Sequence, residues 1–198
     1  MAVNLPALYA EAWTAPRQSM RRILSLGLSE RDRIIMVAIT GVLFAIPVAL
    51  VFKSIEMPVG PDGAPIAAPS TLSTAILVVA IVLLSYYFTA ALIKGIGALF
   101  GGTASYIQCK DAAAWTQFVV GIANLVVMLL SFIVPNALES VLRLIFTAAA
   151  LYVSSAYVAE VHGFGSVGRV IGISVAVTIL ILLLFLPMIP AEVLQAPQ

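Results

Sequence analysis

The sequence predicts an all-α protein, a polytopic transmembrane bundle of about five helices with an N-terminal amphipathic interfacial helix. Of its 198 residues, 62% are hydrophobic and only 10% are charged, whereas soluble domains carry about 25% charged residues. Five apolar stretches each approach the ~20 residues that a helix needs to cross a bilayer. Basic residues gather on one side of these stretches. This composition excludes a water-soluble fold.

Residues 1–33 precede the first apolar stretch and form the predicted cytoplasmic N-terminal segment. Within them, Thr14 to Leu28 is typical of a helix that is capped by Thr14 and has Pro16 in its first turn. At 100° per residue, one face collects the apolar side chains. These are Trp13, Pro16, Met20, Ile23, Leu24 and Gly27, with Gln18, Arg21, Arg22 and Ser25 opposite or flanking.

Two interpretations of this helix remain open. Its apolar face could rest in the headgroup boundary, with Arg17, Arg21 and Arg22 as candidate contacts to anionic lipid. Alternatively, its charges serve only as a positive-inside anchor for the first span.

The five apolar stretches form one predicted transmembrane domain, residues 34–190. They run from Ile34 to Phe52, Leu72 to Ile93, Thr116 to Val134, Val141 to Ala159 and Val170 to Ile189. Helices are required because lipid cannot satisfy backbone N–H and C=O groups, and the alternation of a barrel strand is missing. We expect Pro47 to kink the first span, and Pro187 and Pro190 to end the fifth.

The distribution of Lys and Arg predicts the orientation. One side receives Arg17, Arg21, Arg22, Arg31, Arg33, Lys94, Lys110 and Arg169, and the other receives Lys53 and Arg143. The positive-inside rule then places the N-terminus in the cytoplasm and the tail, residues 191–198, on the other side. The Gly- and Pro-rich segment Ser54 to Ser70 becomes an external loop, and the turn at Pro135 and Asn136 makes spans three and four antiparallel neighbours.

Four glycines cluster after the second span: Gly95, Gly97, Gly101 and Gly102. Their spacing does not fit a phosphate-binding GxGxxG loop and no strand precedes them, so we interpret them as a helix stop. Gly97 with Gly101, and Gly168 with Gly172, also form GxxxG pairs that permit close helix approach.

No pattern indicates a catalytic, cofactor or metal site. His162 is the only histidine, and Glu160 is its only close potential ligand, whereas zinc takes three or four protein ligands. A catalytic triad would have to use the same histidine, and the GxSxG elbow is missing. The single cysteine, Cys109, is expected to be a reduced thiol near the cytoplasmic side.

Polar side chains at membrane depth could line a substrate cavity, but interhelical hydrogen bonds are their commoner use. They are Ser85, Tyr86, Tyr87 and Thr89 in the second span, Gln117 and Asn124 in the third, and Ser154, Ser155 and Tyr157 in the fourth. Near the span ends, Lys94 and Arg143 can extend to the interface, and Trp115 and Tyr106 are expected to mark the cytoplasmic aromatic belt.

Several short segments resemble the bacterial branch of the Yip family, five-span relatives of eukaryotic Ypt/Rab-interacting membrane proteins. They are Trp13 to Arg17, Met20 to Leu24, Gly101 to Tyr106 and Asp111 to Ala114. The resemblance implies a non-enzymatic membrane protein that acts through protein contacts, here in a bacterial inner membrane with a periplasmic C-terminus. The Asp-Leu-Tyr-Gly-Pro segment of eukaryotic members is absent, so we do not expect a Rab-type GTPase as partner.

The leading hypothesis is therefore an accessory, assembly or organising factor that contacts other integral membrane proteins or further copies of itself. One alternative is a small transporter or channel, and another is a membrane-shaping protein that binds anionic lipid. A formal net charge of +1 provides no extended basic surface, so nucleic acid is excluded as a partner.

Overall fold

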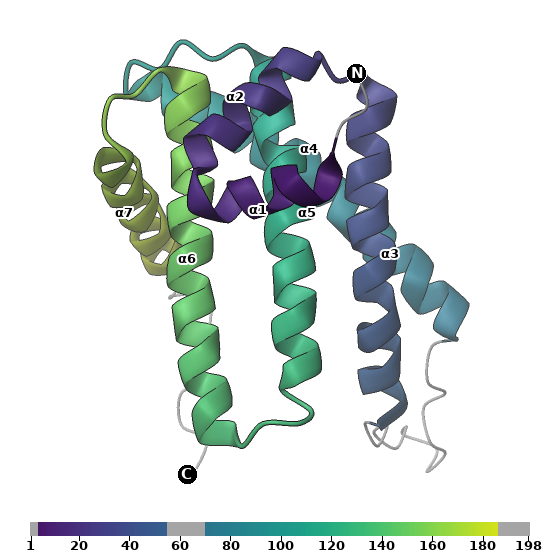
Figure 1. Ribbon diagram of the computed structural model, residues 1–198. Coiled ribbons are helices and arrows are strands. Elements are labelled where there is room, and N and C mark those ends of the chain that lie inside the picture. Colours follow the sequence, from purple (N-terminus) through teal and green to yellow (C-terminus); the bar gives the residue numbers. More distant parts are fainter. Residues whose placement is uncertain (1–3, 55–69, 186–198) are drawn as a thin grey trace.

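The computed structural model describes residues 4–54 and 70–185, and within them the chain forms seven α-helices and no strand (Figure 1). Five of these helices are long and apolar enough to cross a membrane. The all-α class and the number of candidate spans are therefore confirmed. The predicted external loop, the helix end at Pro187 and Pro190, and the tail at 191–198 lie mostly or wholly outside the described residues.

The predicted helix from Thr14 to Leu28 is confirmed over Pro16–Leu26, with Pro16 in its first turn. Its predicted cap, Thr14, instead ends a separate helix that the sequence did not predict. Helix α1 spans Leu5–Thr14 and helix α2 spans Pro16–Leu26. Between them, Ala15 has φ −143° and ψ 64°, outside the helical region. The cause is Pro16, which disfavours helical geometry at the preceding residue and is itself suited to the first position of a new helix.

Helices α3 (Glu30–Ser54) and α4 (Thr71–Leu99) extend beyond the apolar stretches that predicted them. Helix α3 begins at a reciprocal pair in which the Asp32 N–H donates to Ser29 Oγ at 3.2 Å and the Ser29 N–H donates to Asp32 Oδ2 at 3.0 Å. It continues through Pro47. Helix α4 passes through Gly95 and Gly97, so the helix stop is Gly101, with φ 85°.

Helix α5 (Tyr106–Leu130) begins well before the predicted start of the third span at Thr116. Its N-terminus is a capping box, in which Ser105 and Gln108 each accept a hydrogen bond from the other's backbone N–H. Helix α6 spans Asn136–His162 and ends at Gly163, with φ 71°. Helix α7 spans Val167–Phe185.

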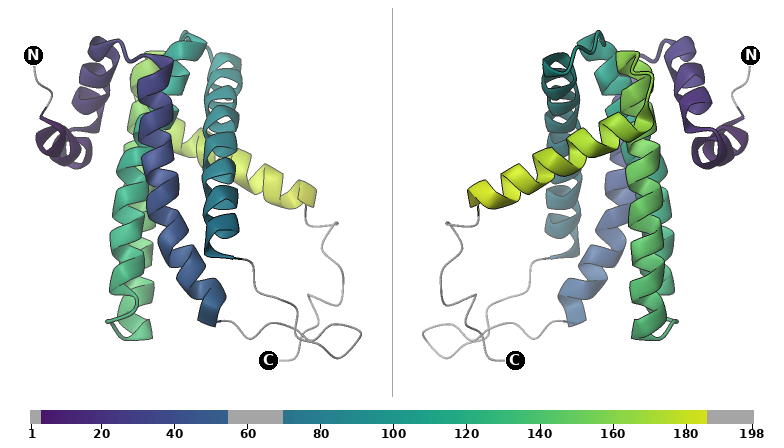
Figure 2. Two further views of the ribbon diagram at one scale, coloured as in Figure 1. Left: turned by 90° about the vertical axis from the view of Figure 1, so that its right-hand side faces the viewer. Right: turned by 90° about the vertical axis from the view of Figure 1, so that its left-hand side faces the viewer.

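The long helices α3, α4, α5 and α6 pack side by side, whereas α7 runs obliquely away from them (Figure 2). One end of the bundle carries α2, the α4–α5 turn and the α6–α7 turn, and we call it the hairpin end. Most of the large, fully buried side chains lie in the half of the bundle nearer this end. They include Trp115, Tyr86, Tyr157, Met20, Ile23 and Cys109.

Candidate functional site

The apolar face of α2 is covered by protein. Met20 and Ile23 are 0% and 2% exposed, and they pack in one cluster with Trp115, Val119 and Tyr157 of α5 and α6. Of the predicted face, Pro16, Met20 and Ile23 are buried whereas Gly27 is exposed, and the buried side packs against the bundle and does not rest in the headgroup boundary. Trp115 is fully buried and its Nε1–H donates to Ser19 Oγ at 3.0 Å, so its predicted place in an aromatic belt is wrong.

The three arginines predicted to contact lipid have different surroundings. Arg17 Nε donates to the Glu160 carboxylate at 2.8 Å, and its other nitrogens donate to the carbonyls of Phe164 and Gly165. It therefore fastens α2 to the C-terminal end of α6. Arg21 lies 3.6 Å from the same carboxylate and Arg22 lies 3.2 Å from Glu11, but their side chains stay 63% and 59% exposed. Contact with anionic lipid stays a prediction for all three.

A buried ion cluster lies where α3 meets α5. Arg33 Nε donates to Asp111 Oδ1 at 2.7 Å, and both side chains are 6% exposed. The same guanidinium reaches Glu30 at 3.2 Å, and Glu30 also binds Lys110 and accepts a hydrogen bond from Tyr87 at 3.1 Å. Sequence reasoning missed this cluster, since Arg33 was considered only as one of the charges that set the orientation in the membrane. Asp111, directly before three alanines and a tryptophan in the sequence, was the signal that could have indicated it.

His162 fills a slot between two glycines. An added Cβ at Gly97 would lie 2.2 Å from the imidazole, and one at Gly102 would lie 2.1 Å from it. His162 Nε2 donates to the Ile93 carbonyl at 2.9 Å and lies 4.0 Å from Cys109 Sγ. The glycines that the sequence assigned to a helix stop therefore make room for a side chain of α6.

The other glycine pair does not mediate helix approach in the described part of the chain. An added Cβ at Gly172 would meet nothing within 4 Å, and one at Gly168 would meet only Ser166 Oγ at 3.5 Å. Within the residues that the structure describes, no three His, Cys, Asp or Glu side chains form a metal-binding group.

Several of the polar residues at membrane depth surround a cavity of about 510 Å³ between α3, α4, α5 and α6. Its polar lining comes from Thr40, Ser85, Thr116, Gln117, Asn124 and Thr147. Gln117 Nε2 donates to Ser85 Oγ at 2.9 Å, which is one of the interhelical hydrogen bonds that the sequence favoured. Ser154 does not line this cavity, and its Oγ donates to the Ala150 carbonyl of its own helix, as Ser85 Oγ does to the Val82 carbonyl.

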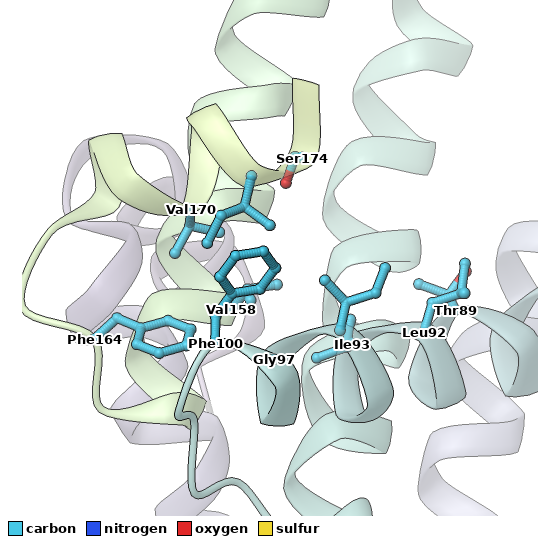
Figure 3. Close-up of a pocket in the computed structure, with 11 residues that line it drawn as sticks. Thr89, Leu92, Ile93, Gly97, Phe100, Val158, Phe164, Val170 and Ser174 are labelled. Carbon is cyan, nitrogen blue, oxygen red and sulfur yellow. The ribbon is translucent and has the colours of Figure 1, made fainter. Parts of the chain in front are cut away.

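A smaller apolar groove of about 130 Å³ separates α4 and α6 from the start of α7 (Figure 3). Phe100, Val158 and Val170 face one another across it. Past this groove α7 touches little else. Its leucines are mostly exposed, with Leu182 at 64% and Leu184 at 66%.

Five long apolar helices, of which α7 diverges from the other four, and a packed end rich in basic residues define a multi-pass α-helical membrane protein. The family model of the Yip1 domain matches residues 10–187 of the chain. The chain therefore belongs to the Yip family, as its sequence motifs suggested. No curated protein and no solved structure matched it.

Proposed function

We propose that this protein is a non-enzymatic accessory or organising factor of a bacterial inner membrane, and that it acts on other integral membrane proteins through lateral helix contacts. The single observation that supports this role is the exposed apolar surface of α7, which diverges from the bundle. It leaves the bundle after its first turns, and its exposed side chains include Val175, Ile179, Leu180, Leu182, Leu183 and Leu184. Such a helix offers an apolar side to the transmembrane helix of a partner, where association depends on close van der Waals packing.

The orientation that we propose places the hairpin end in the cytoplasm and the C-terminus in the periplasm. It is supported by the eight Lys and Arg residues that belong to elements of the hairpin end, against Lys53 and Arg143 near the opposite end. In this orientation α7 presents its exposed leucines inside the bilayer, where a partner span would lie.

Affinity purification from native membranes in mild detergent tests the proposal. A membrane protein should co-migrate at fixed stoichiometry, and it should be lost when Leu180 and Leu184 of α7 are both replaced by Ala. The matched control replaces Leu77 and Ile81, two exposed residues at the same spacing on α4, and should retain the partner. A monodisperse, partner-free protein in every preparation would contradict the proposal.

A small transporter or channel is the second candidate, and the polar side chains among the residues that line the cavity between α3 and α6 favour it. Cysteines at Ser85 and Asn124, which line the cavity, should then react with a water-soluble thiol reagent in liposomes. Ser154 is the matched control, because it is also a serine of a membrane-spanning helix but does not line the cavity. If Ser85 and Asn124 are as unreactive as Ser154, and no solute flux is measured, this function is rejected.

Anionic-lipid binding is the third candidate, and the exposed guanidinium groups of Arg21 and Arg22 favour it. Their joint replacement by Gln should abolish a preference for phosphatidylglycerol over phosphatidylcholine around the reconstituted protein. Arg17 should be left intact in this experiment because it also holds the fold. Arg143→Gln, near the opposite end, is the control, and an unchanged preference in the double variant would reject the role.

A further inference from the structure

Helix α1 does not extend from the end of the bundle but lies across the sides of α5 and α6 (Figure 1). The Tyr9 hydroxyl donates to the Val119 carbonyl at 3.4 Å, and the Trp13 ring lies 6.3 Å from the Phe146 ring between centroids. These contacts fix the height of α1 along the bundle.

Helix geometry gives that height on α5. At ~1.5 Å per residue, α5 is ~37 Å long and Val119 lies ~20 Å from its hairpin end. The hydrocarbon core is ~30 Å thick. With α5 along the bilayer normal, any placement of a ~30 Å layer within the helix leaves Val119 at least ~13 Å inside the hairpin-side boundary.

The same reasoning on α6 agrees. Phe146 lies ~24 Å from the hairpin end of this ~40 Å helix, and hence at least ~14 Å inside the boundary. The side chains of Tyr9 and Trp13 are shorter than these depths, so they could not reach Val119 and Phe146 from a backbone that lay outside the apolar layer. The backbone of α1 therefore lies within the apolar layer or at its edge.

The polarity of α1 suits that position. Leu5, Ala7 and Ala10 are exposed and point away from the bundle core. The only charged residue of the helix, Glu11, has a side chain that is 13% exposed and lies 3.2 Å from the Arg22 guanidinium.

Two further polar side chains, one in α1 and one in its N-cap, have local partners. The Asn4 side chain accepts from the Ala7 N–H at 3.1 Å, and the Thr14 hydroxyl donates to the Ala10 carbonyl at 3.2 Å. Both bonds lie within the helix or its cap. Apart from Glu11, which Arg22 faces, α1 carries no charged residue, which suits contact with lipid acyl chains.

We infer that α1 is embedded in the bilayer, with Leu5, Ala7 and Ala10 in contact with lipid acyl chains in the leaflet at the hairpin end. The occupant of this face is lipid and not cytosol, which alters the prediction that all of residues 1–33 are cytoplasmic. An embedded α1 would add to the anchoring of α2 and would displace acyl chains in one leaflet only. This inference does not depend on the proposed partner contacts of α7.

Site-directed spin labelling of the full chain tests it. A Cys109→Ala background carries one new cysteine at Ala7 or at Ala10, and the labelled protein is reconstituted in phosphatidylcholine vesicles. Both labels should collide with lipid-soluble oxygen and lose collisions with a water-soluble nickel chelate. A label at Leu84, an exposed side chain within α4, is the lipid reference, and a label at Ser25, exposed near the end of α2, is the water reference.

Three outcomes are informative. Labels at Ala7 and Ala10 that behave like the label at Leu84 support the inference. Labels that collide with the nickel chelate as readily as the label at Ser25 overturn it, because α1 would then be in water. Labels that are shielded from both reagents also overturn it, because protein, in this preparation a second copy, would then cover the face. Monodisperse elution of each labelled protein verifies that the fold is retained.

Discussion

The hairpin end and α7 are both rich in apolar residues, but protein covers them very differently. At the hairpin end Ala112, Ala113, Ala114 and Trp115 of α5 are all fully buried. In α7, Val170 is buried near its start, whereas the leucines further along are exposed. The hairpin end has small side chains that allow helices to approach, and α7 has mostly large branched ones. Lipid acyl chains solvate large branched side chains as well as a neighbouring helix does. Helices therefore pack strongly only where small residues and polar pairs occur together.

The largest expected difference between the two regions comes from the buried ion pair. Arg33→Leu should lower the free energy of unfolding in mixed micelles by about 3–5 kcal/mol, because it leaves Asp111 buried without its partner. The double variant Arg33→Met with Asp111→Leu should recover most of this loss. Titration with dodecyl sulfate measures each value.

The control for that experiment is the exposed pair near the opposite end. Arg143 Nε lies 2.7 Å from Glu139, but the arginine side chain is 52% exposed. Arg143→Gln should cost less than about 0.5 kcal/mol. Equal losses for Arg33→Leu and Arg143→Gln would show that the hairpin end is not the more strongly packed region.

The glycine slot provides the next largest effect. Gly97→Ala places a Cβ 2.2 Å from the His162 ring, which the Ile93 carbonyl holds in place. We expect a loss of about 1–3 kcal/mol, typical of overpacking. Gly95→Ala, in the same helix with nothing within 4 Å of the added Cβ, should be neutral or stabilising by up to about 1 kcal/mol.

Removing the imidazole tests the cause of the Gly97→Ala loss. If steric contact is responsible, a His162→Ala background should relieve most of the Gly97→Ala effect in thermal unfolding. An unchanged effect in that background would contradict the slot interpretation.

A smaller effect is expected where α2 meets α5. Ser19→Ala leaves the buried Trp115 Nε1–H without its acceptor and should cost about 1 kcal/mol. Ser25→Ala, on the exposed side of the same helix, is the control and should change little. Both values follow from thermal unfolding in detergent, and a Ser19→Ala value no larger than that of Ser25→Ala would argue against a structural role for the bond.

The smallest effect is expected in α7. Leu180→Ala and Leu184→Ala remove side chains that are 57% and 66% exposed, so each should change the free energy of unfolding by less than about 0.5 kcal/mol. Losses as large as those at the hairpin end, measured in the same micelles, would mean that α7 packs against the bundle in solution.

Much of the fold could be predicted from the sequence. Each span is a local run of apolar residues, and its length is matched to the thickness of the hydrocarbon layer. The same holds for the end of α4, since Gly101, a member of the cluster interpreted as a helix stop, adopts a positive φ, which other residues rarely do. Family membership was also indicated, since the motifs that carried the resemblance fall within the matched residues 10–187.

Helix lengths were predicted less well, and α5 shows why. Its first turns contain Gln108, Lys110 and Asp111, which no apolar scan would assign to a span. They are helical because a capping box starts them and because protein at the hairpin end covers Asp111. A hydrophobic run locates lipid contact, whereas the ends of a helix depend on caps and on neighbouring elements.

By itself, the sequence determined the helical class, the number of candidate spans and the gathering of basic residues at one end, because apolar length and charge are local properties of the chain. Only the tertiary structure decided which polar groups meet. Arg33 and Asp111 are 78 residues apart, and Ser19 and Trp115 are 96 apart. The tertiary structure also decided the height of α1 along the bundle. Such pairings depend on how whole helices pack, and one-dimensional patterns of hydrophobicity carry no record of that packing.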